Sequence, residues 1–476
     1  MTTLVGVDVG TTGVAAIAIE PDGEVVARAE RGYALSTPKP GWSEQNPGDW
    51  WEAAQATLAD VSAGREVAGI GLSGQMHGLV ALGAGDEVLR PAILWNDQRT
   101  GEECAEIERA IGLEQLIELT GNRALPGFTA PKLLWLRRHE PETYARIKRV
   151  CLPKDYVRLR LTGAWAIDVA DASGTLLLDV GNRRWSHDVV EVLALPPEWL
   201  PPVLESPAVS GATEGGIPVA AGAGDQAAAA IGVGVDRPGP ASVVLGTSGV
   251  VFAALPRYRP EPEARVHVFC HALPGSWHAM GVMLSAAGSL QWLRDAIAPG
   301  VPFQALVAEA ADWEPGAEGL LFLPYLQGER TPHADPDARG AFVGLQLRHD
   351  RGALVRAVLE GVAFGLRDSL DLLRGLGLEI TSARASGGGA RSDEWLRICA
   401  SVLGVPIERM VTDEGSAFGA ALLGGVAGAV FADLGEAVAA TVRKSDVVEP
   451  DPGWTEAYSI LHERYRALYP ALRSVR

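Results

Sequence analysis

Two stretches of the chain, GVDVGTTGVAAIAI at 6–19 and SVVLGTSGVVFAAL at 242–255, follow one pattern. Each has an apolar run, a turn of glycine and hydroxyl residues, and a second apolar run. Continuous apolar runs joined by a tight turn predict buried strands of a β-hairpin. The pattern opens both halves of the chain and indicates a weak internal duplication. Because helical and strand patterns alternate after each copy, we expect a duplicated α/β architecture with a cleft between the halves.

The chain has 476 residues, which is more than one hydrophobic core usually serves. The segment DRPGP at 236–240 has the glycine and proline content of a turn between domains. We therefore expect two domains, at 1–235 and 236–476.

Other elements follow from hydrophobic periodicity. In the first half we predict a helix at 50–63, strands at 67–74 and 90–95, and helices at 101–120 and 130–149. In the second half we predict a helix at 350–376, a strand at 381–389 and a helix at 392–403.

The amino-acid composition argues against several classes of function. The formal net charge is −18, so the surface repels nucleic acid and anionic membrane, and neither partner is expected. The uncharged run 415–431 is dominated by Gly and Ala, which favours a buried helix over a membrane span. Four scattered cysteines without CxxC pairing are typical of reduced thiols and give no zinc site. No signal segment precedes the first strand, so we expect a soluble cytoplasmic protein.

One acidic residue lies at the centre of the chain, Asp225 in PVAAGAGDQAAAAIG at 218–232. The pattern places it where a strand ends and a helix begins. A helix N-terminus stabilises a carboxylate by roughly 0.3–1 kcal/mol. Asp is also a common N-cap residue, which is the simpler alternative. The glycine-rich turns on either side of it favour a functional carboxylate facing a cleft.

The two hairpin turns are candidate phosphate sites. Small residues let backbone N–H groups approach an oxyanion closely, and hydroxyl groups add donors. Asp8, beside the first turn, is placed to hold Mg²⁺ directly or through water. A single turn of this kind is usually only a hairpin, but two at matching places favour a phosphate clamp. A third glycine segment, at 386–390, suits close packing of a phosphate or a flat ring. The motifs GxxxxGK[ST], HRD, DFG and GxSxG are absent.

Together with GFTAPKLLWL at 127–136 and the segment 344–370, these features resemble the FGGY family of carbohydrate kinases over nearly the whole chain. The resemblance implies two ribonuclease-H-like domains of the actin/hexokinase type. Within the family, GQMHG at 74–78, WNDQR at 95–99 and GERTPH at 328–333 are most similar to xylulokinases.

The resemblance also implies an activity, the ATP-dependent phosphorylation of D-xylulose to D-xylulose 5-phosphate with Mg²⁺. It makes Asp225 the general base and Asp8 the essential acid near the metal. The implied sugar contacts are Gln75, Met76, His77, Trp95, Asn96, Asp97, Asp225 and Gln226. The implied nucleotide contacts are Gly10, Thr11, Thr12, Gly246, Thr247, Ser248, Gly387, Gly388, Gly389 and Ser392. The N-terminal domain then binds sugar and the C-terminal domain binds adenosine.

One residue departs from the family pattern. Gln226 stands where xylulokinases usually have Asn, which keeps the amide but moves it one methylene outward. Kinases for another ketose, a polyol or a sugar acid therefore stay open as alternatives. An actin-like or chaperone-like ATPase is the alternative from another class, and the polar set Gln75 to His77 with Asn96 and Asp97 argues against it. Dimers occur in this family, so a homodimer is one expectation from the resemblance, although the sequence itself leaves the oligomeric state open.

Overall fold

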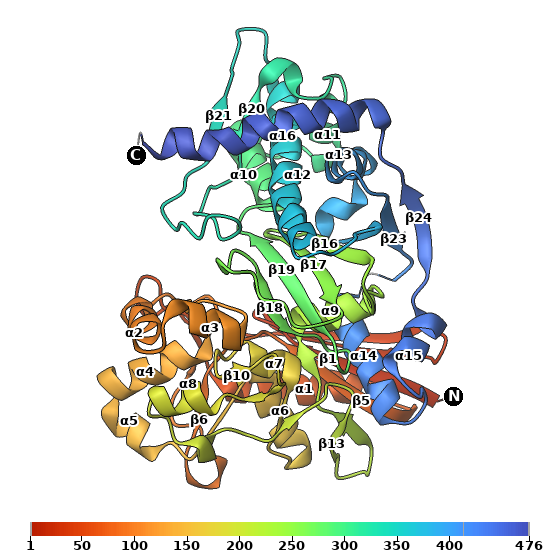
Figure 1. The fold of residues 1–476 in the computed structure, drawn as a ribbon. Helices are drawn as coiled ribbons and strands as arrows, with labels where there is room; N and C mark the ends of the chain where they lie inside the picture. The colour runs from red at the N-terminus through yellow and green to blue at the C-terminus, as the bar shows by residue number, and fades with distance from the viewer. Residues whose placement is uncertain (1, 413, 475–476) are drawn as a thin grey trace.

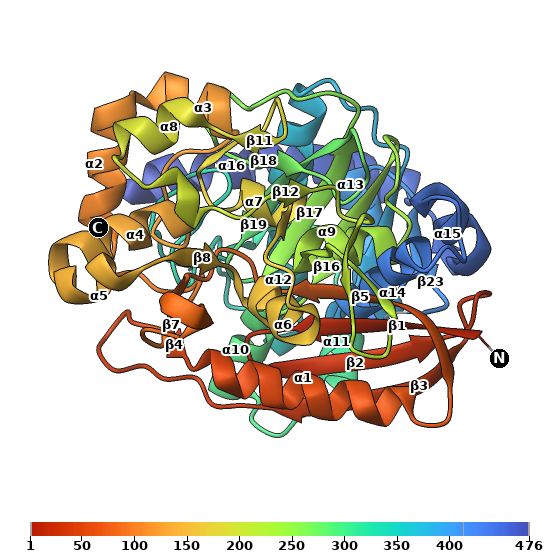
Figure 2. The same cartoon turned by 90° about the horizontal axis from the view of Figure 1, so that it is seen from below.

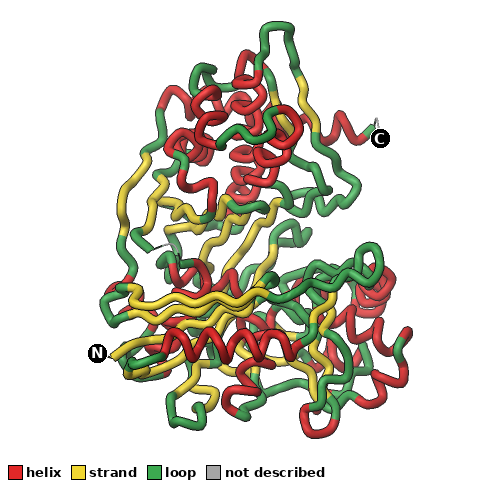
Figure 3. Tube along the Cα trace, turned by 180° about the vertical axis from the view of Figure 1, so that it is seen from behind, coloured by secondary structure: helices red, strands yellow, loops and turns green. Residues whose placement is uncertain are grey.

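The computed structural model describes residues 2–412 and 414–474. Figure 1 shows two α/β halves, one above the other, with the N-terminus in the lower half and the C-terminal helix across the upper one. Each half contains one seven-stranded mixed sheet. Figure 3 shows the strands of both sheets from behind, with helices on either side of them.

The first sheet has the order β13-β14-β5-β1-β2-β3, with β15 paired beside β5. Its strands are β1 (Thr2–Val9), β2 (Gly13–Ile19), β3 (Val25–Gly32), β5 (Glu66–Gly74), β13 (Val209–Ala212), β14 (Pro218–Ala220) and β15 (Ala223–Gly224). Strands β1, β2 and β3 form an antiparallel meander, and β5 runs parallel to β1.

The second sheet has the order β18-β19-β17-β16-β22-β23-β24. Its strands are β16 (Pro240–Leu245), β17 (Gly249–Leu255), β18 (His267–Cys270), β19 (Trp277–Met283), β22 (Ser382–Ser386), β23 (Ile407–Met410) and β24 (Lys444–Val448). An antiparallel meander β16-β17-β19 lies beside parallel β22, as β1-β2-β3 lies beside β5. The predicted duplication and the α/β fold class are confirmed.

Two helices cover opposite faces of the first sheet, because alternate residues of a strand point to opposite sides. Val5, Val7 and Val9 belong to the core that includes Trp50 of α1 (Pro47–Ser62), while Leu4 packs with α14 (Gly415–Ala427). Figure 2 shows α1 lying along β1, β2 and β3. The predicted buried helix in 415–431 is therefore correct, and it packs against the sheet of the other half.

Glycines make the approach of α14 to this sheet possible. A Cβ atom added to Gly71 would lie 1.8 Å from the Ala420 carbonyl oxygen, and one added to Gly6 would lie 1.9 Å from that of Ala417. Helix and strands therefore touch through their backbones.

A second core joins the two halves. Met76, Phe128 and Leu133 of the first half pack with Phe252 and Met280 of the second sheet. The other face of the second sheet packs on α12 (Arg351–Gly375). The bounds of this helix agree with the predicted 350–376 to within one residue at each end.

The remaining elements surround these layers. The other helices are α2 (Gly101–Ile111), α3 (Leu113–Thr120), α4 (Thr129–His139), α5 (Pro141–Arg146), α6 (Pro153–Thr162), α7 (Val169–Ser173), α8 (His187–Val192), α9 (Asp225–Gly232), α10 (Ala287–Ile297), α11 (Phe303–Ala310), α13 (Asp393–Leu403), α15 (Leu434–Thr441) and α16 (Pro452–Arg473). The small sheets are formed by β4 (Glu44–Gln45), β6 (Val80–Leu82), β7 (Ala92–Ile93), β8 (Arg149–Cys151), β9 (Ile167–Asp168), β10 (Leu178–Asp179), β11 (Arg184–Trp185), β12 (Val203–Leu204), β20 (Leu321–Leu323) and β21 (Ala341–Val343).

Four predicted elements are wrong in extent. The strand predicted at 381–389 is β22, which ends at Ser386 because Gly387 has φ 86° and Gly388 begins a 3₁₀ turn. The helix predicted at 101–120 is two helices, because Gly112 has φ 91° and turns the chain. The helix predicted at 130–149 ends at His139, and Pro141 begins a new one, since proline has no N–H to continue the first. The strand predicted at 90–95 pairs only at Ala92 and Ile93.

The four cysteines are buried and free, as predicted for reduced thiols. Within the described ranges, the helices are all too short or too polar to cross a lipid bilayer.

Candidate active site

Three strands of the first sheet end side by side and bring the predicted acidic residues together. Strand β5 pairs in parallel with β1 on one side and with β15 on the other, so Ser73 is the partner of both Asp8 and Ala223. The carboxyl ends of parallel strands are where ligands bind in such sheets. Asp8, the segment Gln75 to His77, and Asp225 therefore meet at one edge.

Asp225 is the first residue of α9, after Gly224, which holds the N-cap position. The simple N-cap alternative is therefore wrong by one residue. Burial raises the pKa of Asp225 to about 7, and the negative charge of Asp8 adds to the rise. Hydrogen bonds from the Gln226 backbone and side chain act in the opposite direction. A carboxyl group with this pKa can accept a proton near neutral pH.

Asp8 is held by two hydroxyl groups. Its Oδ1 atom accepts a hydrogen bond of 2.8 Å from Ser73, and Ser416 at the start of α14 also bonds to it. Burial raises the pKa of Asp8, and these two hydroxyls partly offset the rise. Among the residues that the structure describes, no basic side chain is one of the causes of this shift in pKa.

The first predicted phosphate turn is ordered by an amide. Gln75 Nε2 donates to the Gly10 carbonyl oxygen at 3.2 Å, and its Oε1 atom lies 3.4 Å from the Thr11 hydroxyl. Gln45 extends this contact, because its Nε2 atom donates to the Thr11 carbonyl oxygen at 2.7 Å. Thr12 is exposed at the tip of the turn. Gln45 was not predicted from the sequence, because it belongs to the two-residue strand β4 and lies in no motif.

His77 has a backbone conformation that few residues other than glycine adopt, with φ 69°. Its carbonyl oxygen accepts hydrogen bonds from Thr129 Oγ1 at 3.0 Å and Lys132 Nζ at 2.9 Å. Both residues belong to the stretch GFTAPKLLWL at 127–136, which is one of the features that carry the family resemblance. The structure therefore gives that stretch a physical role, which is to hold the strained backbone of His77.

The imidazole of His77 is fixed as well. Nδ1 lies 2.7 Å from the Gly174 carbonyl oxygen, so Nδ1 carries the hydrogen and Nε2 is an acceptor. Burial and, to a smaller extent, the charges of Lys132 and Arg330 together lower the pKa of His77 to about 3. The ring is neutral at physiological pH. Lys132 and Arg330 lie in the quoted stretches 127–136 and 328–333, but no role was predicted for either, and Gly174 lies in no motif.

Aromatic rings connect this region to the second sheet. The ring centroid of His77 lies 4.8 Å from that of Phe128 and 6.1 Å from that of Phe269 on β18. Phe269 in turn stacks on His267, which is buried. The second half therefore forms one wall around His77.

The segment Trp95 to Asp97 is split between exposed and buried positions. Trp95 is 38% exposed, and its Nε1 atom donates to Thr11 Oγ1 at 3.0 Å. Asp97 is fully buried, forms an ion pair of 2.7 Å with Arg99 and accepts from the Ser43 N–H. Asn96 Oδ1 is buried without a hydrogen-bond partner among the described residues. These two contacts of Asp97 are to Oδ2, and Oδ1 accepts from the Arg99 backbone N–H and Nε at 2.9 Å. Both oxygens of Asp97 are therefore engaged, whereas the Asn96 amide has a free acceptor.

The second sheet repeats the arrangement for the other predicted phosphate turn. Strands β16 and β22 are parallel, with Val244 opposite Ser386, so the turn Gly246 to Ser248 and the glycines 387–389 meet at one edge. Thr247 and Ser248 are exposed. Gly387 has φ 86°, and a Cβ there would lie 2.9 Å from the Leu245 carbonyl carbon.

The glycines 387–389 lead directly into a helix. Gly388 and Gly389 begin a short 3₁₀ turn, and a Cβ on Gly389 would lie 2.8 Å from that of Leu245. Ser392 then caps α13, and its side chain accepts from the Trp395 N–H. The structure thus gathers two sets of predicted residues, one at the edge of each sheet.

Comparison with known proteins shows that the two parts of the chain that carry these residues match two domains of one protein family. Residues 3–232 match the N-terminal domain of the FGGY family of carbohydrate kinases, and residues 241–428 match its C-terminal domain. A xylulose kinase of Escherichia coli (strain K12) is 43% identical over 482 residues, which cover 98% of this chain and 99% of that relative.

Solved structures give the same result. A structure described as a "xyloylose kinase" from Brucella ovis matches with a TM-score of 0.94 and 44% identity, and covers 100% of both chains. The xylulose kinase of Rhodospirillum rubrum matches with a TM-score of 0.93 and 35% identity over 99% of both chains. The fold is thus the ribonuclease-H-like, actin/hexokinase type expected from the sequence. The chain belongs to the FGGY family of carbohydrate kinases.

Proposed function

We propose that this protein transfers the γ-phosphoryl group of ATP to a terminal hydroxyl of D-xylulose, giving D-xylulose 5-phosphate and ADP. The observation that carries the proposal is Asp225, whose pKa is raised to about 7 at the sheet edge that also bears Asp8 and His77. Relatives named xylulose kinase that cover nearly the whole chain support this choice of sugar.

Asp225 is the general base in this mechanism. Its carboxylate accepts the proton of the sugar hydroxyl as the hydroxyl oxygen bonds to the γ-phosphorus. The bond from that phosphorus to the β–γ bridging oxygen breaks, and ADP leaves. A positioned base of this kind contributes about 10²–10⁴-fold to the rate. Its place at the start of α9 helps, because the helix N-terminus stabilises the charged carboxylate.

The sugar contacts come from Gln75 to His77 and from Gln226. His77 offers Nε2 as an acceptor for a sugar hydroxyl, since Nδ1 already donates to Gly174. Because its pKa is about 3, this acceptor stays available at any physiological pH. Trp95 and Asn96 complete the set, and Asn96 Oδ1 is free to accept.

Asp97 acts differently in this proposal. Both its oxygens are used by Arg99 and the Ser43 N–H, so it positions the neighbouring Asn96 and Trp95. Its contact with the sugar is then indirect.

Asp8 is suited to Mg²⁺. It is a carboxylate beside a second one, Asp225, without a basic side chain among the groups that shift its pKa. Such an oxygen donor set is what Mg²⁺ prefers, and the cation would relieve the repulsion of the two acids. Mg²⁺ would neutralise charge on the transferring phosphate when bound.

The nucleotide phosphates bind between the two hairpin turns, one from each half of the chain, and the adenosine lies against the second half. In the two hairpin turns, the donors to phosphate oxygens are the hydroxyl groups of Thr11, Thr12, Thr247 and Ser248. Gly10 and Gly246 lie beside them and leave room for the phosphates, and the Gly10 N–H itself donates to the Gly13 carbonyl oxygen. The glycines 387–389 and Ser392 border the adenosine. Exposure of Thr12, Thr247 and Ser248 leaves their hydroxyl groups accessible to such a ligand.

A panel of candidate substrates tests this function. ADP release is measured with MgATP and, separately, D-xylulose, other ketoses, polyols and sugar acids. The proposal predicts the highest kcat/KM for D-xylulose. A higher kcat/KM for any other class of substrate contradicts the sugar assignment, and ATP-driven filaments without sugar-stimulated turnover contradict the kinase assignment.

A further inference from the structure

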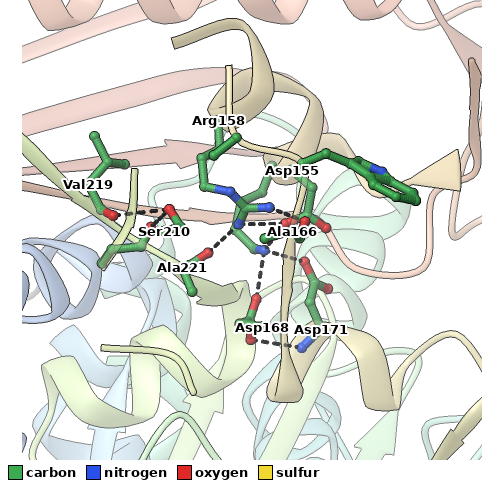
Figure 4. A network of polar contacts seen from close by, with 12 residues as sticks. Asp155, Arg158, Ala166, Asp168, Asp171, Ser210, Val219 and Ala221 are labelled. Atoms are coloured by element: carbon green, nitrogen blue, oxygen red, sulfur yellow. Dashed lines mark hydrogen bonds and ion pairs between the residues drawn. The ribbon is translucent and has the colours of Figure 1, made fainter. Parts of the chain in front are cut away.

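A buried cluster of charged side chains lies directly behind the sugar side of the site. We call it the Lys154 network, and it consists of Lys154, Asp155, Arg158, Asp168 and Asp171. All five side chains are 1% exposed or less. Figure 4 shows Asp155, Asp168 and Asp171 converging beside Arg158.

Lys154 is the centre of this network. Its Nζ atom lies 2.6 Å from Asp155 Oδ1, 2.7 Å from Asp168 Oδ2 and 3.2 Å from Asp171 Oδ2. The three carboxylates are close enough to hold a metal ion, but the ammonium group already fills the space between them. Burial alone lowers the pKa of Lys154, and the three carboxylates reverse this and raise it above its usual value. The lysine is therefore charged.

The network is attached to the turn that carries Asp225. Arg158 Nη1 donates to the Ala221 carbonyl oxygen at 2.6 Å. Asp168 Oδ1 accepts from Ser206 Oγ at 3.3 Å, and the Gly222 N–H donates to the Ser206 carbonyl oxygen at 3.0 Å. These bonds fix the backbone at Ala221 and Gly222, four and three residues before the base.

The methylene chain of Lys154 packs against the same turn. A Cβ on Gly222 would lie 3.0 Å from Lys154 Cδ, and a Cβ on Gly74 would lie 3.2 Å from Lys154 Cβ. Gly74 immediately precedes Gln75 at the end of β5. The lysine stem therefore lies between the turn before Asp225 and the strand end before the sugar contacts.

The network also reaches His77. Asp171 belongs to α7, and its carbonyl oxygen accepts from the Gly174 N–H at 3.0 Å. The Gly174 carbonyl oxygen is in turn the partner of His77 Nδ1. The contact is tight, because a Cβ on Gly174 would lie 2.4 Å from that nitrogen.

We propose that Lys154 is a positioning residue for the transfer reaction: its ammonium group ties α6 to α7 and so holds Asp225 and His77 in one geometry. Lys154 does not itself contact substrate. Rates of positioned reactions fall steeply when the reacting groups are displaced by a fraction of an ångström to one ångström. A lysine whose contacts extend to both the base and a sugar contact is placed to prevent such a displacement.

The inference rests on the proposed sugar phosphorylation and is tested with the full-length protein. Lys154→Met removes the charge and keeps the chain length. Arg356→Met is the matched control, because Arg356 is also fully buried and is paired with Glu360, on α12 of the other half. For both variants kcat, the KM values for D-xylulose and ATP, and the melting temperature are measured where at least 95% of the protein is folded.

We expect Lys154→Met to lower kcat at least tenfold and to raise the KM for D-xylulose several-fold, with the KM for ATP within twofold of the parent. Arg356→Met lowers the melting temperature and leaves kcat and the KM for D-xylulose within twofold. If Lys154→Met keeps kcat and the KM for D-xylulose within twofold, the proposal is wrong and the network only stabilises the fold. A parent protein without activity on D-xylulose refutes the proposed function instead, and the panel then supplies the sugar for this test.

A second variant covers the case in which Lys154→Met does not fold. Asp171→Asn keeps the size of the side chain and removes one of the three carboxylates. We expect kcat/KM for D-xylulose to fall at least threefold, with an unchanged KM for ATP. Unchanged sugar kinetics in this folded variant overturns the proposal.

Discussion

Asp8 and Asp225 lie at the same end of the first sheet, because β1 and β15 both pair with β5 at Ser73, and the negative charge of Asp8 raises the pKa of Asp225. Asp8 lies near the end of β1 and Asp225 begins α9 directly after β15, and these two strands, far apart in the sequence, both pair with β5. One carboxylate can therefore stay charged near a metal while the other exchanges a proton near neutral pH. This pairing leads to the first two predictions.

The pH dependence of kcat/KM follows from the pKa of Asp225, which is about 7. The base must be deprotonated, so kcat/KM falls about tenfold per pH unit below that value and levels off above it. His77, with a pKa of about 3, does not contribute to this fall in kcat/KM at acidic pH. Initial rates with D-xylulose between pH 5 and 9 measure the midpoint. A profile that is flat from pH 5.5 to 8 contradicts the assignment of the base.

Asp8→Asn removes the charge that raises the pKa of Asp225. We expect the acidic midpoint to move to lower pH, by about one unit at most, since burial is the larger cause of the shift. The plateau rate also falls steeply, because Asp8 is proposed to hold Mg²⁺. Residual rates at saturating Mg²⁺ give the midpoint. An upward shift, or none with an unchanged plateau, would show that the two acids do not interact.

Asp225 also affects stability. Its pKa in the folded protein lies above its ordinary value of 3.8, so its contribution favours folding at low pH and is lost as pH rises through 7. Asp225→Asn therefore raises the free energy of unfolding at pH 8.5 by ~1–3 kcal/mol, after allowance for partial exposure. The gain is smaller at pH 5. Urea unfolding at both pH values measures the difference, and a larger gain at pH 5 would reverse the predicted sign.

Gly71 tests the backbone contact between α14 and β5. A methyl group there meets the Ala420 carbonyl oxygen at 1.8 Å, so helix and strand must separate. We expect Gly71→Ala to lower the free energy of unfolding by about 3 kcal/mol or more. Gly375→Ala is the control, because that glycine lies at the exposed end of α12 with nothing near its Cβ. The control gains up to about 0.5 kcal/mol from helix propensity. Equal melting temperatures for the two variants would contradict this packing.

Much of the fold could be predicted from the sequence, because the two copies of the hairpin pattern carry the centre of each sheet. The predicted ends of helices were wrong where a single residue interrupts the helical backbone, as at Gly112 and Pro141. The packing of α14 on the first sheet could not be predicted, since it depends on contacts across more than 340 residues, such as Gly71 with Ala420. That helix also shows that the proposed boundary at 235/236 does not separate all contacts of the two halves.

The residues of the candidate site also fall into those that could be predicted from the sequence and those that could not. Motifs identified Asp8, the segment Gln75 to His77, and Asp225, because acids and glycines at strand ends have a local pattern. Gln45 and the Lys154 network have no such pattern, since they act through hydrogen bonds that form only when distant segments fold together. The contacts with nucleotide and sugar, the cytoplasmic location and the homodimer stay predictions.

The role of Asp225 as the base is tested most directly by the turnover of Asp225→Ala with D-xylulose and MgATP at pH 8. The variant is compared with the parent, and ATP binding is measured in parallel by calorimetry. We predict that kcat falls at least 10²-fold while the affinity for ATP stays within about threefold, because the base acts on the sugar hydroxyl. A kcat within a few-fold of the parent value would contradict the mechanism.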